Sequence, residues 1–204
     1  MTSFVFTMKK ALAVILVVLV ADQALKVWIK TTMILGQEHV IFDWFIIHFT
    51  ENVGMAFGME FGGDYGKLAL SLFRIVAVGA IGYYLYSITN KGASNVVIVA
   101  LSLVFAGALG NIIDSTFYSL VFSDSYGQVA TMFPAEGGYA GILYGRVVDM
   151  FYFPLIDGHV PSWSPIWPNK HFLFFNAIFN VADAAITVGM GMIILFQKQF
   201  LREG

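Results

Sequence analysis

Four long apolar stretches, separated by segments that carry most of the charge, constrain what this chain of 204 residues can form. They lie at about residues 11–30, 68–88, 94–115 and 172–196. Each is close to the ~20 apolar residues that an α-helix needs to cross the hydrocarbon core of a bilayer. The pattern predicts an all-α polytopic membrane protein with four transmembrane helices in a single domain, residues 1–204.

The composition excludes the other broad classes of protein. Hydrophobic residues make up 58% of the chain and charged residues 12%, whereas a soluble domain has about 25% charged residues. The net charge of −2 leaves no basic surface for DNA or RNA, so we expect no nucleic-acid partner. The chain has no cysteine, and its four histidines form no HExxH motif or close ligand pair, so we expect no metal.

The positions of the basic residues predict how the chain is oriented. Basic residues predominate in both terminal segments and in the short turn around Lys91, whereas acidic residues predominate in two long connections, at about 31–66 and 116–171. Loops with an excess of lysine and arginine stay in the cytoplasm. We therefore expect both termini inside and both long connections outside.

The two outer connections differ in composition. Between residues 39 and 61 the first is rich in β-branched and aromatic residues, which predicts a small extracytoplasmic β-structure. The second contains a stretch rich in proline and tryptophan at 161–168, whose Trp163 and Trp167 suit the headgroup level of a membrane. A connection as long as the second is typical of a functional segment.

Charged side chains inside the apolar stretches are the first candidates for function. A charge at the centre of a bilayer costs at least about 2.5–3.5 kcal/mol on insertion scales, so it needs a partner or a role. Asp22 and Lys26 are four residues apart and face the same way on a helix. We expect them to pair, with the Lys26 amine reaching toward the outer interface.

Two segments share one pattern of polar residues. Asn111 and Asp114, in the third stretch, have the same spacing as Asn180 and Asp183 in the fourth. Residues three apart lie on one face of a helix, and neither pair tolerates lipid, so we expect both pairs to face a common interior cavity. A simpler interpretation, in which polar side chains only hold helices together, stays open for the asparagines.

Another carboxylate, Asp149, lies in an apolar run just before the fourth stretch. Chain reversal would bring it close to Asp183 at the outer boundary of the membrane. Two carboxyl groups in a poorly solvated site cannot both ionise readily, so one keeps its proton. Such a pair supplies an acid and a base that share a water and can hydrolyse a peptide bond. Spacing alone does not choose its members among Asp22, Asp114, Asp149 and Asp183.

Five motifs, in order along the chain, point to a known family. They are Asp22 with Lys26, Asn52-Val-Gly54-Met-Ala56-Phe57, Gly107-Ala-Leu-Gly110-Asn111-Ile-Ile-Asp114, Val147-Val148-Asp149, and Phe179-Asn180-Val-Ala182-Asp183. On these residues the chain resembles the bacterial lipoprotein signal peptidases (signal peptidase II), which are membrane aspartyl proteases. The resemblance covers nearly the whole chain.

The resemblance implies a set of site residues. Asp149 and Asp183 match the two catalytic aspartates of the family, which resolves the choice that spacing left open. The residues that match substrate-binding or supporting positions of the family are Asn52, Gly54, Asn111, Asn180, Asp22, Lys26 and Asp114.

The resemblance also implies a substrate and a location. The family acts on prolipoproteins that already carry diacylglycerol on a cysteine, and it hydrolyses the peptide bond before that cysteine without a metal or an organic cofactor. The implied location is the bacterial cytoplasmic (inner) membrane, with the active site near the outer face. Membrane lipids are then the other expected partners, and we expect a monomer.

The chain departs from the family pattern in two places. Ser115 stands where the common pattern has an arginine after Asn-x-x-Asp, and an inserted segment lies at about 116–144. Arg146 comes just before the paired valines, and we hypothesise that it supplies the missing cation beside Asp114 or the substrate carbonyl. The insert is either an extended lid or a lipid-facing collar.

Two other functions are compatible with buried polar side chains. A small proton- or ion-coupled transporter also places aspartate and asparagine inside a membrane, although the repeated Asn-x-x-Asp pattern is the only hint of the internal repeats typical of transporters. A non-catalytic membrane scaffold gives no reason for so many carboxylates at one depth. Cleavage of a lipidated prolipoprotein separates the peptidase from both.

Overall fold

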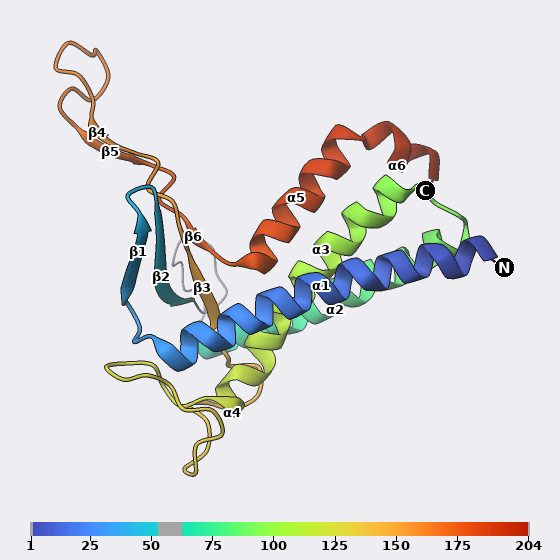
Figure 1. The fold of residues 1–204 in the computed structure, drawn as a ribbon, viewed down its shortest axis with the longest axis horizontal. Helices are drawn as coiled ribbons and strands as arrows, with labels where there is room; N and C mark the ends of the chain where they lie inside the picture. The colour runs from blue at the N-terminus through green and yellow to red at the C-terminus, as the bar shows by residue number, and fades with distance from the viewer. Residues whose placement is uncertain (1, 53–62, 204) are drawn as a thin grey trace.

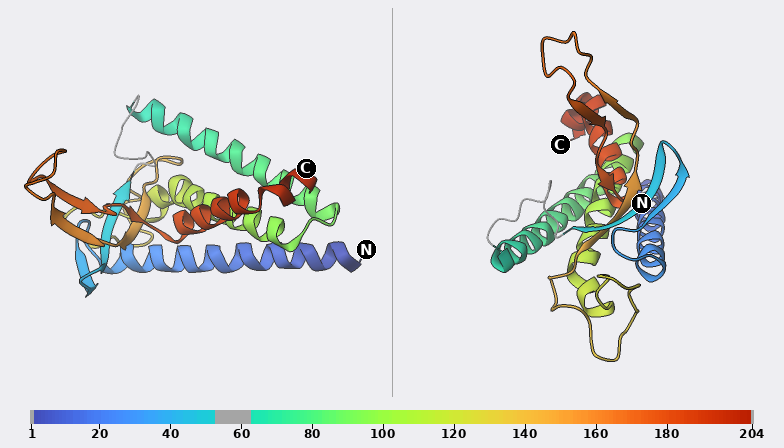
Figure 2. Two further views of the ribbon diagram at one scale, coloured as in Figure 1. Left: turned by 90° about the horizontal axis from the view of Figure 1, so that it is seen from above. Right: turned by 90° about the vertical axis from the view of Figure 1, so that its left-hand side faces the viewer.

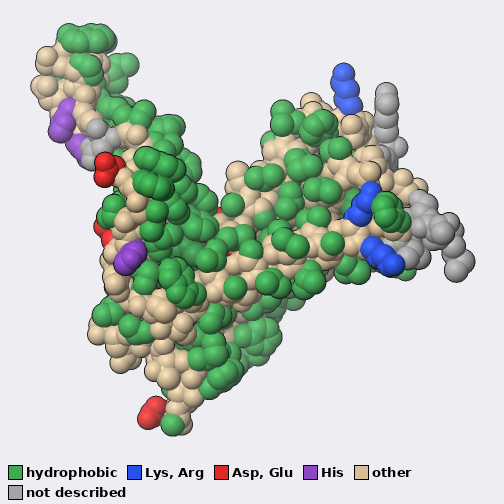
Figure 3. Space-filling model, in the orientation of Figure 1, with side chains coloured by type: hydrophobic (Ala, Val, Ile, Leu, Met, Phe, Trp, Pro, Cys, Tyr) green, Lys and Arg blue, Asp and Glu red, His purple; other side chains and the backbone are tan. Residues whose placement is uncertain are grey.

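The apolar stretches form long helices with hydrophobic residues on their outer sides. The computed structural model describes residues 2–52 and 63–203, and its longest helices are α1 (Thr2–Thr32), α2 (Gly63–Asn90) and α3 (Asn95–Ile113). Hydrophobic side chains are spread over the visible surface of the helices (Figure 3). Such surfaces are stable in lipid rather than in water.

Three helical runs are long and apolar enough to cross a membrane: Phe6–Thr32, Tyr65–Asn90 and Asn95–Val121. The third run continues from α3 through a π-helical turn, η2 (Asp114–Tyr118), into a short last turn, α4 (Ser119–Val121). These runs confirm the first three predicted spans. The third ends later than expected, because η2 and α4 continue it beyond residue 115.

The fourth predicted span, 172–196, is wrong at its start. Its first part contains strands β5 (His171–Phe174) and β6 (Ile178–Phe179), and only then does the chain enter helix α5 (Val181–Leu195), which is followed by α6 (Gln197–Glu203). At about 1.5 Å per residue, α5 is shorter than the ~30 Å hydrocarbon core. Among the described residues there are therefore three helices of spanning length, and α5 is a shorter apolar helix.

A capping box explains why α5 begins where it does. The Asn180 side chain accepts a hydrogen bond from the Asp183 amide at 2.9 Å, and the Asp183 side chain accepts one from the Asn180 amide at 3.4 Å. Both interactions satisfy backbone N–H groups that the first turn of a helix leaves without partners. Asn180 itself has an extended backbone, so the helix cannot reach back to residue 172.

A small antiparallel sheet lies at the end of the helices opposite to both termini (Figure 1). It contains β1 (Glu38–Phe42), β2 (Phe45–Asn52), β3 (Val147–Tyr152) and β6, in the order β1-β2-β3-β6. The expected β-structure of the first outer connection is present. It is not confined to that connection, because β3 and β6 come from the second.

Two segments reach out from the sheet end on opposite sides of the helices (Figure 2, right). One is the hairpin of β4 (Ile156–His159) and β5, and the other is the insert between α4 and β3. The returning part of the insert closes the end of the third helix. The amides of Leu143 and Gly145 donate to the carbonyls of Thr116 and Ser115, at 3.2 Å and 2.9 Å. Carbonyl groups that a helix end leaves free are satisfied in this way.

Small residues let α3 and α5 pack closely. A Cβ atom added at Gly107 of α3 would lie 2.2 Å from the Ala182 carbonyl oxygen and 2.7 Å from Cγ1 of Ile186. One added at Gly110 would lie 2.7 Å from Oδ2 of Asp22. Both glycines therefore bring the backbone of α3 against groups that cannot move easily, as small residues do at helix interfaces in membranes.

We expect Gly107→Ala to destabilise the protein by about 1–3 kcal/mol, since α3 and α5 must separate to admit the methyl group. Thermal unfolding of the purified protein in detergent measures the effect. Gly191→Ala is the matched control, because a Cβ atom there meets nothing within 4 Å. Equal unfolding temperatures for the two variants would contradict the packing described here.

Candidate active site

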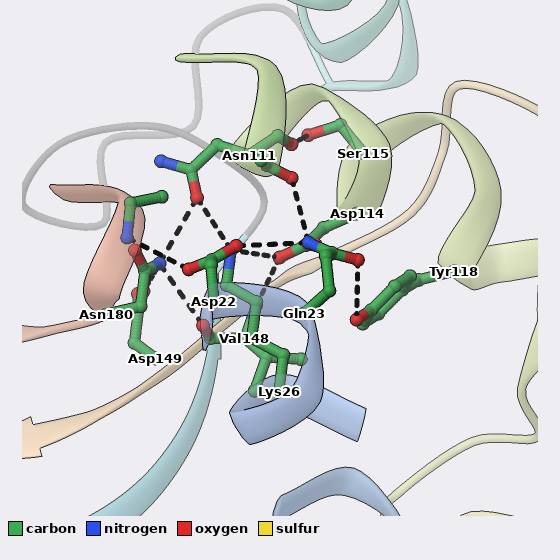
Figure 4. A network of polar contacts seen from close by, with 12 residues as sticks. Asp22, Gln23, Lys26, Asn111, Asp114, Ser115, Tyr118, Val148, Asp149 and Asn180 are labelled. Carbon is green, nitrogen blue, oxygen red and sulfur yellow. Dashed lines mark hydrogen bonds and ion pairs between the residues drawn. The ribbon is translucent and has the colours of Figure 1, made fainter. Parts of the chain in front are cut away.

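Polar side chains from four separate segments meet where the helices join the sheet (Figure 4). They come from α1 (Asp22, Gln23, Lys26), the α3–η2 junction (Asn111, Asp114), β3 (Asp149) and the start of α5 (Asn180, Asp183). The fold thus gathers the four aspartates that the sequence offered as candidates.

Lys26 lies at the centre of this cluster and is fully buried. Its ammonium nitrogen lies 2.9 Å from Oδ2 of Asp22 and 2.7 Å from Oδ2 of Asp114, and it donates to Oδ1 of Asn111 at 2.9 Å. Its three N–H donors thus have three acceptors. The expected Asp22–Lys26 pair is confirmed. The amine does not reach toward the outer interface, however, because the Asp114 carboxylate holds it inside.

Asn111 connects Lys26 to the second pair of carboxyl groups. A lysine ammonium only donates, so the Asn111 carbonyl oxygen must face Lys26, and its amide nitrogen is left to donate to Oδ1 of Asp183 at 2.8 Å. The Asn180 amide nitrogen lies 2.6 Å from Oδ1 of Asp149 and 3.2 Å from Oδ1 of Asn111. The two Asn-x-x-Asp segments therefore face one site, as their spacing predicted.

Asp149 is the most buried of this second pair of carboxyl groups. It is 4% exposed, and Asn52, the last residue of β2, donates a hydrogen bond to its Oδ2. Burial and the nearby Asp183 carboxylate raise the pKa of Asp149 to about 7, against the opposing hydrogen bonds from Asn52 and Asn180. Near neutral pH the Asp149 carboxyl group can therefore hold a proton.

Asp114 links α1 to β3 through its carboxylate. Besides Lys26, its carboxylate accepts hydrogen bonds from the Gln23 side chain at 2.9 Å and from the Val148 backbone amide at 3.3 Å. The second of these fixes β3 at the residue next to Asp149. The π-helical turn begins at Asp114, and turns of this kind occur frequently at functional sites.

Asp22 attaches α1 to the start of α5. Its Oδ1 accepts a hydrogen bond from the backbone amide of Ala182, at 2.9 Å, next to Asp183. Its Oδ2 accepts from Gln23 at 3.0 Å as well as contacting Lys26. Asp22, Lys26 and Asp114 thus form one charge cluster. Through Asp114 the cluster contacts the backbone next to Asp149, and through Asp22 it contacts the backbone next to Asp183.

A second buried charge cluster lies one helical turn further along α1. Lys30 forms an ion pair with Glu51, the residue before Asn52, and donates to the Ser125 hydroxyl at 2.8 Å. The Arg146 guanidinium lies 3.1 Å from the other oxygen of Glu51 and 3.4 Å from Asp124. Ser125 and Asp124 belong to the insert, so this cluster ties the insert to the strand end that contacts Asp149.

This cluster answers one half of the hypothesis for Arg146, a contact with Asp114, whereas a contact with the substrate carbonyl stays a prediction. Lys26, and not Arg146, is the cation beside Asp114. The position where the family pattern has arginine is filled by Ser115, which is buried beneath the insert and donates to the Asn111 carbonyl oxygen at 2.9 Å. The Arg146 guanidinium faces Glu51 and Asp124 instead.

Sequence analysis missed several members of these clusters. Gln23 is adjacent to Asp22, and Tyr118 lies four residues after Asp114 on the same helix face. Both side chains are neutral, and a neutral side chain carries no signal of burial in a sequence. Lys30 continues the four-residue spacing of Asp22 and Lys26, and that spacing was the available signal. Gly54 lies outside the described residues. Among the described residues, no three His, Asp or Glu side chains group as metal ligands.

The chain is similar to known proteins of one family. The model of the family described as signal peptidase (SPase) II matches residues 14–198. A lipoprotein signal peptidase of Porphyromonas gingivalis is 52% identical over 188 residues, covering 92% of this chain and 82% of that protein. One from Amoebophilus asiaticus is 34% identical over 199 residues, covering 95% of this chain and 80% of that protein. A solved structure of a bacterial membrane enzyme has a TM-score of 0.59 at 26% identity, covering 92% of this chain and 91% of that one.

We expect Lys26→Met to destabilise the protein by about 3–5 kcal/mol, because it leaves the buried Asp22 and Asp114 carboxylates without their cation. Adding Asp22→Asn and Asp114→Asn should restore part of this loss, since the amides carry no charge. Thermal unfolding in detergent compares the variants. Lys9→Met, an exposed lysine on the same helix, should unfold like the unmodified protein, and an equal result for Lys26→Met would contradict the arrangement.

Proposed function

The chain belongs to the signal peptidase II family, and from this premise we propose that it is an aspartyl endopeptidase that hydrolyses the bond before the lipidated cysteine of diacylglyceryl-modified prolipoproteins. At the level of the family, it is a protease that processes lipoprotein signal peptides at a bacterial membrane. An ion-coupled transporter or a scaffold would not account for a match to a peptidase family over residues 14–198.

Asp149 and Asp183 form the proposed catalytic pair. The observation that supports this assignment is their convergence: each accepts a hydrogen bond from an asparagine amide, and those two asparagines, Asn111 and Asn180, contact each other. Asp22 and Asp114 are both within contact distance of the Lys26 ammonium, and we assign them a supporting role. Asp149 and Asp183 are held by amide donors instead, and this is the pair proposed to share a proton.

In the proposed reaction, the ionised carboxylate takes a proton from a water whose oxygen attacks the scissile carbonyl carbon. The protonated carboxyl group donates its proton to the carbonyl oxygen, which gives a tetrahedral diol. Collapse of this intermediate re-forms the carbonyl, breaks the carbon–nitrogen bond and transfers a proton to the leaving amine of the cysteine. The two carboxyl groups act as one unit, so either can begin as the base.

Substrate binding is proposed for the residues around this pair. The Asn52 amide at the end of β2 contacts Asp149, so we propose that Asn52 helps to present the substrate backbone. For Gly54 the same role rests on the motif alone. Arg146 and Glu51 hold that strand end from the side of the insert. We propose that the lipid chains of the substrate lie among the spanning helices of a monomer in the bacterial inner membrane. Both termini are then cytoplasmic and the site lies near the outer face.

We expect Asp149→Asn and Asp183→Asn each to abolish cleavage, by at least ~1,000-fold, because each removes a proton-transfer group that the reaction needs. The assay incubates the purified protein with a diacylglyceryl-modified prolipoprotein and follows the mass of the released signal peptide. Unfolding temperatures close to that of the unmodified protein would show that the loss is chemical.

Asp43→Asn is the matched control for these variants. Asp43 is an exposed aspartate in the turn between β1 and β2, at the same end of the molecule, and its replacement should leave cleavage unchanged. Appreciable turnover by either Asp149→Asn or Asp183→Asn would overturn the catalytic assignment.

We expect kcat/KM to fall as the pH rises above about 7. The raised pKa of Asp149 means that the shared proton is held below that pH and is lost above it, which leaves two carboxylates and no acid. A profile measured between about pH 5.5 and 9 should show the decline, approaching tenfold per pH unit. Activity that stays constant up to pH 9 would contradict a pair that shares one proton.

A further inference from the structure

A two-stranded hairpin reaches sideways from the sheet end of the molecule. It consists of β4, β5 and the residues that connect them, and we call residues 156–174 the arm. His159 of β4 pairs with His171 of β5, so the strands stay joined up to the connecting residues. Figures 1 and 2 show that the arm leads obliquely away from the sheet, outward past the sheet end of α1 and to one side of the helices.

The end of the arm is apolar and uncharged. Residues 160–169 contain no Asp, Glu, Lys or Arg. Trp163, Ile166 and Trp167 are 82%, 64% and 68% exposed, so none of them packs into the protein. A cluster of exposed large apolar side chains is unfavourable in water and marks a surface that another phase or molecule covers.

This apolar surface continues into the base of the arm. Trp44, in the turn between β1 and β2, stacks on Phe153, which stacks on Phe179, and Phe175 packs against the edge of Phe179. Phe174 at the end of β5 is 55% exposed and extends this aromatic surface. The surface therefore runs from the sheet, beside the ends of the spanning helices, out along the arm.

The chemistry of the end of the arm fits the headgroup level of a bilayer. Tryptophan is enriched there, because its ring is apolar and its N–H still finds a polar partner. The Lys170 ammonium lies 4.6 Å from the centre of the Trp167 ring, at the border of the uncharged segment. This places one cation where lipid phosphates would lie, next to side chains that suit the acyl chains.

We propose that the arm lies along the outer surface of the membrane that holds the helices, with Trp163, Ile166 and Trp167 inserted at the boundary between headgroups and acyl chains. The arm then acts as a lateral support that fixes the depth of the site, since β3 and β6 join its base to Asp149 and Asn180. The proposal rests on the membrane location of the helices and not on the identity of the catalytic residues.

Tryptophan fluorescence in proteoliposomes tests the proposal independently of activity. The chain has four tryptophans, so a Trp163-only protein needs Trp28→Phe, Trp44→Phe and Trp167→Phe. Phosphatidylcholine brominated close to the glycerol end of its chains should quench Trp163 strongly, and lipid brominated near the chain ends should quench it less. A Trp28-only protein is the positive control, because Trp28 is 51% exposed on the surface of α1.

A pair of variants at Ile166 makes the test sharper. In the Trp163-only protein, Ile166→Asp should abolish quenching by the brominated lipid, because a carboxylate opposes insertion. The matched control Ile166→Val should keep it. Absence of quenching at Trp163, while Trp28 is quenched, would overturn the proposal. The proposal would also be overturned if Trp163 became shielded from water only at a higher protein density in the vesicles. A second copy of the chain would then cover the arm.

Discussion

The contact on which the rest of the structure depends is the burial of the Lys26 ammonium among Asp22, Asp114 and Asn111. A charge without partners is not tolerated at this depth, so the three acceptors must be brought together from α1 and from the α3–η2 junction. Each acceptor also holds something else. Asp22 binds the first turn of α5, Asp114 binds β3, and Asn111 binds Asp183. The cluster around Lys26 thus sets the relative positions of the elements that carry the proposed catalytic pair.

The same helix face repeats this solution one turn further on. Lys30 pairs with Glu51, and Arg146 and the insert complete the enclosure of that pair. Buried ion pairs contribute little net stability when compared with apolar packing, but they are strongly directional and costly to break. Here such a pair fixes the position of Glu51, which comes just before Asn52, and Asn52 donates to Asp149. The insert therefore contacts the residues that hold the end of β2 through Ser125, which is buried, and Asp124, which is partly exposed.

The sequence predicts the parts of this protein that depend on local spacing. The first three spans follow from the length of the apolar runs, and the Asp22–Lys26 pair and the shared direction of the two Asn-x-x-Asp segments follow from helical periodicity. The start of α5 is not predictable in this way. An apolar run is compatible with a strand or with a helix, and only the cap shows where the helix begins. The pairing of β2 with β3 depends on contacts across about a hundred residues, and the partners of Arg146 depend on where the insert returns. Periodicity carries no information on either.

The start of α5 shows how closely the fold and the proposed chemistry are joined. Asn180 and Asp183 close the capping box that begins the helix, and the same two side chains contact the site through the Asn180 amide and the Asp183 carboxylate. A helix that began at residue 172 would be long enough to span. Asn180 would then lie inside the helix, where the backbone N–H groups already have partners, and its side chain could not accept a hydrogen bond from them. The short helix is therefore the condition for placing a carboxylate at a helix N-terminus, where the backbone favours negative charge. Asp149 has no such support, because it is buried in strand β3, and its burial raises the pKa of its carboxyl group to about 7.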